Sequence, residues 1–229
     1  MKRLASQLVA ALLLGSVAGC GSSGGSSPSG PVTFPLRSAY VSLVISGWSK
    51  TFVVSGDCSG TGSTTSAPAS TSAIPFEGVT GRLSALQTST MSLTNCTPSS
   101  IASGATNFYD TSFNLLGFDS TGNYGVVQSP LVIPASVMVG SAGNVGTIDL
   151  FTSSAKSVGN GRQDWTYVVE ADTADTAIIN RIAKLYDASS ALVSTEQDRY
   201  RIAATGALVP LSADIQFASP ALHLVLTYN

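Results

Sequence analysis

Apolar and polar residues alternate along most of the chain after residue 31, with the period of two that is typical of β-strands. In "SAYVSLVISGWSKTFVVSGDC" (38–58), Val41, Leu43 and Ile45 fall on one face of such a strand. The stretch "RLSALQTSTMSLTNC" (82–96) alternates in the same way. We therefore predict strands over both stretches, and the first one should be a hairpin that reverses near Gly47.

Short apolar runs separated by turn residues continue to the end of the chain, for example "DWTYVVEA", "LVPLSADIQFA" and "LHLVLTY". Many short strands with regular turn signals favour an all-β fold made of antiparallel sandwich-like or barrel-like sheets. Proline is poorly tolerated inside a central strand, and Pro130 and Pro134 lie close together. This spacing predicts a junction between two β subdomains, residues 31–133 and 134–229.

Residues 176–186 allow two interpretations. Ile178, Ile182 and Leu185 fit one face of a helix, but "LYDASSALV" (185–193) reads as a tight turn between two strands. We favour the strand. In that case Arg181 lies opposite Asp198 or Glu196, depending on where the turn is centred, and either pair is a favourable cross-strand contact.

The first 20 residues have the three zones of a secretory signal peptide. Lys2 and Arg3 give a positive start, residues 4–14 are mostly apolar, and small residues follow. The apolar run is about half of the ~20 residues that a membrane-spanning helix needs. The four residues ending this segment, Val17-Ala18-Gly19-Cys20, resemble the lipobox of bacterial lipoproteins, with Val where that family prefers Leu. The resemblance implies that residues 1–19 are removed and that Cys20 is lipidated.

Residues 21–30 are a run of Gly, Ser and Pro directly behind that cysteine. Gly/Ser-rich chains are flexible coils, and a segment of this length typically reaches about 15–20 Å. We interpret residues 20–30 as a lipid attachment point and a tether. The resemblance implies a lipid-anchored protein of the cell envelope. In a Gram-negative cell it implies the outer membrane, since Gly21 is not the Asp that marks inner-membrane retention.

Lipidation of Cys20 would leave Cys58 and Cys96 as an even pair in an oxidising compartment, where disulfides form and persist. We predict a disulfide between them. Neither cysteine belongs to a Cys-x-x-Cys motif, so the sequence does not indicate a redox-active pair.

Charged residues make up only 10% of the chain, and its formal net charge is −2. Typical soluble domains contain about 25% charged residues, whereas Ser and Thr supply most of the polarity here. The chain has no strongly basic stretch, which argues against nucleic acid as a partner.

The densest charge cluster is "EQDRYR" (196–201), and two interpretations of it remain open. Its charges can pair across neighbouring strands, or the cluster can be a polar binding patch with Tyr200 as an aromatic platform. Period two divides it into Glu196, Asp198 and Tyr200 on one face and Arg199 and Arg201 on the other. The longer stretch "EQDRYRIAATG" resembles segments of uncharacterised proteobacterial exported proteins, which implies no particular activity.

We assign no catalytic residue, metal ligand or cofactor from the sequence. The single histidine, His223, excludes sites built from several histidines. The acidic loop with Glu170, Asp172 and Asp175 lacks the spacing of an EF-hand. We expect a non-enzymatic binding or structural module that contacts another envelope component, a protein or a glycan. The alternative is a hydrolase or carbohydrate-active enzyme whose carboxylates are brought together by the fold.

Overall fold

The computed structural model describes residues 32–229, so the predicted signal peptide, Cys20 and the tether lie outside the described residues. Within this range the chain forms one helix, α2 (Leu36–Ser46), and thirteen strands. No helix in the same range combines the length and apolar character that crossing a bilayer requires.

The strands follow one another along the chain and nearly all are longer than five residues. They are β1 (Trp48–Gly56), β2 (Ser59–Ser66), β3 (Ser70–Thr71), β4 (Leu83–Thr94), β5 (Ser100–Tyr109), β6 (Leu115–Ser120), β7 (Asn123–Val127), β8 (Ala142–Phe151), β9 (Gly159–Ala171), β10 (Thr176–Tyr186), β11 (Leu192–Ala203), β12 (Leu208–Ala218) and β13 (Ala221–Tyr228).

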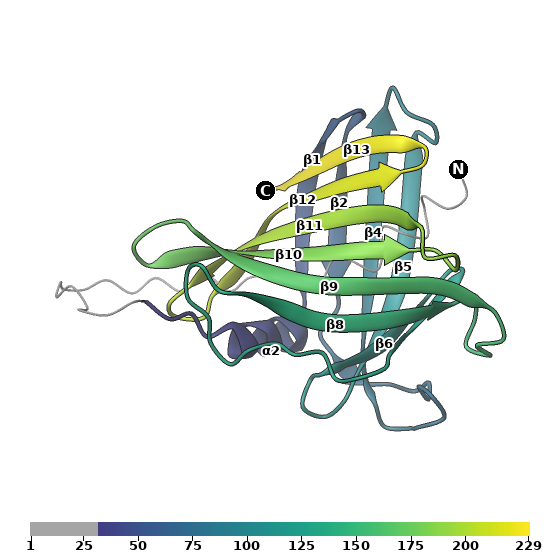
Figure 1. Ribbon diagram of the computed structural model, residues 1–229, viewed down its shortest axis with the longest axis horizontal. Helices are drawn as coiled ribbons and strands as arrows, with labels where there is room; N and C mark the ends of the chain where they lie inside the picture. Colours follow the sequence, from purple (N-terminus) through teal and green to yellow (C-terminus); the bar gives the residue numbers. More distant parts are fainter. Residues whose placement is uncertain (1–31) are drawn as a thin grey trace.

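All of these strands except β3 form a closed antiparallel barrel, which confirms the all-β prediction. Each strand pairs with the next along the chain from β4 to β13, β13 pairs with β1, β1 with β2, and β2 with β4. Figure 1 shows β8 to β13 as one curved layer, with β1, β2, β4 and β5 running across behind it. Closure gives nearly every strand two hydrogen-bonded neighbours.

The two predicted subdomains are not shown as separate bodies. Pro130 and Pro134 do lie outside strands, in the connection between β7 and β8. However, β7 pairs with β8 across this connection, and β1 pairs with β13. Strands from both sides of residue 133 therefore belong to one sheet.

The strand predicted over residues 38–46 is wrong, because this segment is the helix α2. Its buried residues, Leu36, Ala39, Tyr40, Leu43 and Val44, recur at intervals of three and four, which matches one face of a helix. The helix ends at Gly47, whose φ is +64°. A Cβ at this position would lie 2.5 Å from the backbone nitrogen of Pro68, so the chain can turn closely here only at a glycine.

The strand interpretation of residues 176–186 is confirmed, since β10 covers this segment. In its pairing with β11, Arg181 lies opposite Asp198 and Ile182 opposite Gln197. This register corresponds to a turn centred on Ser189 and Ser190. The charge cluster of β11, residues 196–201, therefore lies beside Arg181, the one arginine of β10.

The barrel interior contains two apolar clusters and a polar layer between them. The larger cluster surrounds α2 and includes Tyr109, Trp165, Ile179 and Tyr200. The smaller one lies at the other end and includes Phe52, Met91 and the Cys58 side chain. Between them lie buried polar residues from both walls of the barrel: Thr64, Ser66, Gln87, Ser89, Asn107, Gln163, Arg181, Ser194, Glu196 and Asp198.

Candidate functional site

The polar layer contains a buried ion pair between β10 and β11. Arg181 Nε donates a hydrogen bond to Asp198 Oδ2 at 3.1 Å, and Arg181 Nη2 donates to the same oxygen. The Asp198 side chain is 2% exposed and that of Arg181 10%. Removing the Arg181 charge would leave a charged Asp198 uncompensated in a low-dielectric interior. The pair therefore has to be treated as one unit.

A second carboxyl group, that of Glu196, lies beside this pair on the same face of β11. Burial raises the pKa of Glu196 well above its ordinary value, and the nearby Asp198 charge raises it further, while Arg181 acts in the opposite direction. A hydrogen bond to Asp198 also favours the protonated form of Glu196. Burial raises the pKa of Asp198 as well, while the Arg181 charge acts against this rise. The two carboxyl groups therefore titrate as a coupled pair beside one arginine.

Aromatic side chains surround the charges. The Arg181 guanidinium carbon lies 4.5 Å from the centroid of the Trp165 ring, a cation–π distance. Trp165 Nε1 donates to Gln163 Oε1 at 3.2 Å. This hydrogen bond orients the indole, which shields one side of the guanidinium from water.

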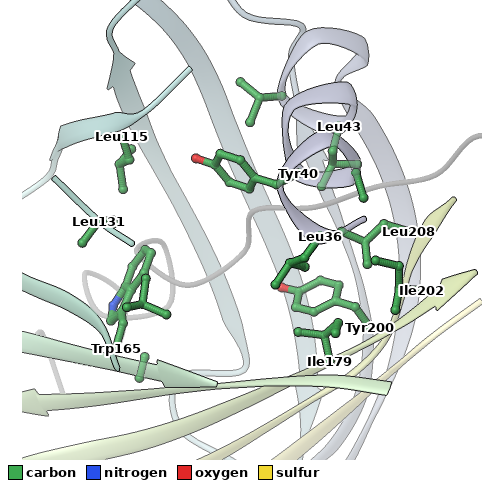
Figure 2. Packing of buried hydrophobic residues seen from close by; sticks show 14 of the residues in the cluster. Leu36, Tyr40, Leu43, Leu115, Leu131, Trp165, Ile179, Tyr200, Ile202 and Leu208 are labelled. Atoms are coloured by element: carbon green, nitrogen blue, oxygen red, sulfur yellow. The ribbon is translucent and has the colours of Figure 1, made fainter. Parts of the chain in front are cut away.

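A cavity of about 70 Å³ lies between α2 and the wall formed by β8 to β11. Most of its lining is aliphatic or aromatic. The lining residues are Leu36, Arg37, Tyr40, Asn114, Leu115, Leu131, Ile133, Pro134, Val145, Trp165, Tyr167, Ile179, Arg181 and Tyr200. Figure 2 shows the close packing of α2 over this region, with Trp165 and Leu131 on the side opposite Tyr40 and Tyr200.

The lining has an inner and an outer part. Trp165, Arg181 and Tyr200 are buried and form its inner end, whereas Arg37 and Asn114 are half-buried at the rim. Arg37 Nη2 donates to the Ser112 carbonyl oxygen at 2.6 Å and to Asn114 Oδ1 at 2.9 Å. These bonds tie the first turn of α2 to the loop between β5 and β6.

Neither Glu196 nor Asp198 lines this cavity. The fold does bring two carboxyl groups together, as the enzyme alternative requires. They lie behind Arg181, however, and the exposed fractions of the whole residues are 7% and 1%. The pair is therefore not positioned to meet a substrate in the cavity.

The predicted patch of five residues is divided between two faces of the barrel wall. Glu196, Asp198 and Tyr200 point inward and are buried. Arg199 and Arg201 point outward, where they form ion pairs with Glu170 and Asp172 of β9 and the loop after it. The alternation in the sequence is confirmed, and the outer arginines form ion pairs that reach across β10 and do not join neighbouring strands. The five residues do not share one surface.

Other residues singled out from the sequence have structural partners. Cys58 and Cys96 form the predicted disulfide, which links the end of β1 to the loop after β4. His223 is exposed, and its Nε2 lies 3.1 Å from Asp214 Oδ1. Within residues 32–229, no group of three or more His, Cys, Asp or Glu residues could hold a metal ion.

Tyr40 and Trp165 line the cavity but were not predicted from the sequence as site residues. Tyr40 lies in the segment wrongly assigned to a strand, and a helical reading of its apolar spacing would have placed it beside Leu36 and Leu43. Trp165 is one of two tryptophans in the chain. No local signal shows that its ring stacks on an arginine from the neighbouring strand.

Comparisons of the chain with models of known protein families, with curated proteins and with solved structures find no match.

Proposed function

We propose that this chain is a non-enzymatic binding protein that takes up a small, mostly apolar molecule inside its barrel. The observation that carries this proposal is the cavity beneath α2, whose lining is mainly aliphatic and aromatic with a few polar groups. This composition is typical of small-molecule sites, in which apolar walls provide affinity and a few polar groups orient the ligand.

The buried positions of the charged residues favour binding over hydrolysis. A hydrolase needs its carboxyl groups within reach of the bond that is broken. Glu196 and Asp198 are close to each other but do not line the cavity. A surface platform built on Tyr200, for a protein or glycan partner, is also disfavoured, because this residue is only 2% exposed.

Occupation of the cavity can be measured directly with four-carbon probes. The two tryptophan indole N–H signals in an NMR spectrum of the full-length protein provide a reporter and a reference. Trp165 lines the cavity and Trp48 does not. Millimolar 1-butanol, butanamide or sodium butanoate should shift the Trp165 signal while the Trp48 signal stays in place, and the Trp48→Phe variant assigns the two signals.

Val145→Phe should abolish the shift, because the larger side chain fills the cavity that Val145 lines. Val53→Phe is the matched control, since Val53 lies on the outer face of β1 and is 47% exposed. An unshifted Trp48 signal in both variants would show that the barrel is intact. If no probe moves the Trp165 signal in the unaltered protein, the proposed function is wrong.

We further propose that the barrel is attached to the cell envelope through lipidated Cys20, and to the outer membrane in a Gram-negative cell. The support is the lipobox resemblance, the zones of the signal peptide and the Gly/Ser segment behind Cys20. Two or more acyl chains hold a protein stably on a membrane.

The Cys20→Ser variant should therefore move from the membrane fraction to the soluble fraction, or remain unprocessed. A processed variant that still sediments with membranes would refute the lipid anchor.

A further inference from the structure

The connection between β7 and β8 exposes three large apolar side chains. Val132, Met138 and Val139 are 64%, 41% and 51% exposed, and all three lie between the end of β7 and the start of β8. Single apolar residues scattered over a surface are normal, whereas a group of them is typical of a contact site. This loop is therefore a candidate interaction surface.

Met138 and Val139 form the tip of a tight turn, which we call the apolar turn (residues 138–141). The Ser141 backbone N–H donates to the Met138 carbonyl oxygen at 2.9 Å, and the Met138 N–H donates to Ser141 Oγ at 3.1 Å. Gly140 has a φ of +86°, as the third position of a type II turn requires. Turn residues are usually Gly, Pro, Asn, Asp or Ser, so the turn itself does not call for two large apolar side chains.

The residues on both sides of the tip are fixed to the barrel. Val137 and Phe34 are joined by two backbone hydrogen bonds of 2.8 and 2.9 Å, and their side chains are buried. On the other side, the Gly140 N–H donates to the Val169 carbonyl oxygen at 2.8 Å. Met138 and Val139 lie between these two attachment points, so the fold presents them to the surroundings.

The pairing of Phe34 with Val137 also places the start of the described residues beside the apolar turn. Figure 1 shows the chain entering α2 next to the loop that leads into β8. Cys20 precedes this point by only 14 residues along the sequence. A lipid on Cys20 would thus be joined to the barrel on the side where Met138 and Val139 are exposed.

The charges near the apolar turn do not oppose contact with lipid. No Lys, Arg, Asp or Glu occurs between Asp119 and Asp149, and charged side chains are costly to bring into a hydrocarbon environment. Glu170 follows the residue that is bonded to Gly140, and its carboxylate is paired with Arg199. Contact through this loop would therefore be apolar and would not depend on anionic lipids.

We propose that Met138 and Val139 insert into the surface of the lipid bilayer and turn the side of the barrel where α2 begins toward the membrane. This inference rests on the proposed lipid anchor at Cys20. The acyl chains hold the protein on the membrane, whereas the apolar turn determines which side of the barrel meets it. Since one acyl chain by itself binds a membrane only marginally, two side chains act as an orienting contact and not as a second anchor.

The test measures how close the apolar turn lies to lipid. A fluorescent dye is attached to the Val139→Cys variant of the full-length lipidated protein, on phosphatidylcholine vesicles with and without brominated acyl chains, which quench the dye on contact. Leu86→Cys is the matched control, because Leu86 is 53% exposed on the outer face of β4. We expect at least about twofold stronger quenching at position 139, since apolar groups at an interface lie about 5–10 Å deep at the headgroup and acyl boundary.

Met138→Asp should remove the excess quenching at position 139, because a carboxylate beside the dye makes insertion costly. Leu86→Asp adds the same charge to the wall of the barrel and should leave the quenching at position 139 unchanged. Both variants should still float with the vesicles, because the lipid on Cys20 holds them. Raising the salt concentration from about 0.1 M to about 1 M should have no effect, since salt screens only contacts between charges.

Four results would count against the proposal in different ways. Equal quenching at positions 139 and 86, in a protein that floats with the vesicles, would overturn the membrane contact and leave the lipid anchor in place. Quenching that is lost at high salt would overturn the apolar nature of the contact. Dye emission at position 139 that changes with protein concentration in the Cys20→Ser variant, without vesicles, would assign the turn to contact between two copies of the chain. A lipidated protein that does not float would refute the anchor together with this inference.

Discussion

Glu196 shows how a single residue can make the stability of this barrel depend on pH. The side chain is buried beside Asp198 on one face of β11, and only Asp198 has an arginine directly opposite it. Two adjacent carboxylates cannot both be charged at low cost in such a place. We therefore expect the pair to retain one proton when the chain folds, and Glu196, which has no arginine opposite it, to be the group that holds it.

In the Glu196→Gln variant, the free energy of unfolding should decrease less steeply with rising pH above pH 5 than in the wild type. Because the folded-state pKa of Glu196 lies above the unfolded value of about 4.3, its contribution is complete below that pH. The contribution is lost as pH rises toward the folded-state pKa, by up to about 1.4 kcal/mol per pH unit. Urea unfolding at pH 5, 6, 7 and 8 measures this slope. Glu170→Gln on the outer face is the control, and equal slopes in wild type and Glu196→Gln would contradict the assignment.

At the scale of single elements, α2 and β10 show which segments a sequence pattern can assign. β10 was predicted correctly because the turn that follows it can be read from nearby residues, whereas the choice between Asp198 and Glu196 as the partner of Arg181 was left to the structure. The residues of α2 carry apolar side chains at positions compatible with periods of two and of about 3.6. Whether the segment forms a helix or a strand depends on the apolar end of the barrel into which it packs. This end is built from strands that lie far away in the sequence.

Leu43 and Ile45 distinguish the two structures experimentally. A strand would place both side chains on one face, whereas α2 buries Leu43 at 3% exposure and leaves Ile45 at 48%. Leu43→Ala should lower the free energy of unfolding by about 2–5 kcal/mol. Ile45→Ala should change it by less than about 0.5 kcal/mol. Chemical denaturation measures both, and similar losses in the two variants would contradict the helix.

At the scale of the whole molecule, closure of the barrel depends on the seam where β2 meets β4. This pairing joins strands that are separated by β3 and by the loop containing Phe76, which packs on the outer face of β5 and β7. The disulfide crosses the same region, because Cys58 lies between β1 and β2 and Cys96 follows β4. It holds three strands of the seam together at one end.

Replacing both cysteines, Cys58→Ser with Cys96→Ser, should destabilise the barrel by roughly 3–4 kcal/mol. A cross-link that closes a loop of 38 residues restricts the unfolded chain by about this amount in the chain-entropy model. Denaturant unfolding of the double variant and of the oxidised parent, compared at equal pH, gives the difference. A midpoint identical to that of the parent would show that the disulfide does not stabilise the closed barrel.

The sequence by itself determined the features that depend on neighbouring residues. These are most of the alternating strands, the turn that sets Arg181 against a carboxylate of β11, the division of residues 196–201 into two faces and the pairing of Cys58 with Cys96. Periodicity shows that two faces exist, because successive side chains of a strand point in opposite directions.

Only the tertiary structure decided which face is inside. Closure between β2 and β4 placed Glu196, Asp198 and Tyr200 in the interior and Arg199 and Arg201 outside. It also brought together the apolar cluster into which residues 36–46 bury one face as a helix. The cavity lined by Tyr40 and Tyr200 forms only when the barrel has closed and α2 has packed against it. Its lining comes from segments that meet through long-range pairing.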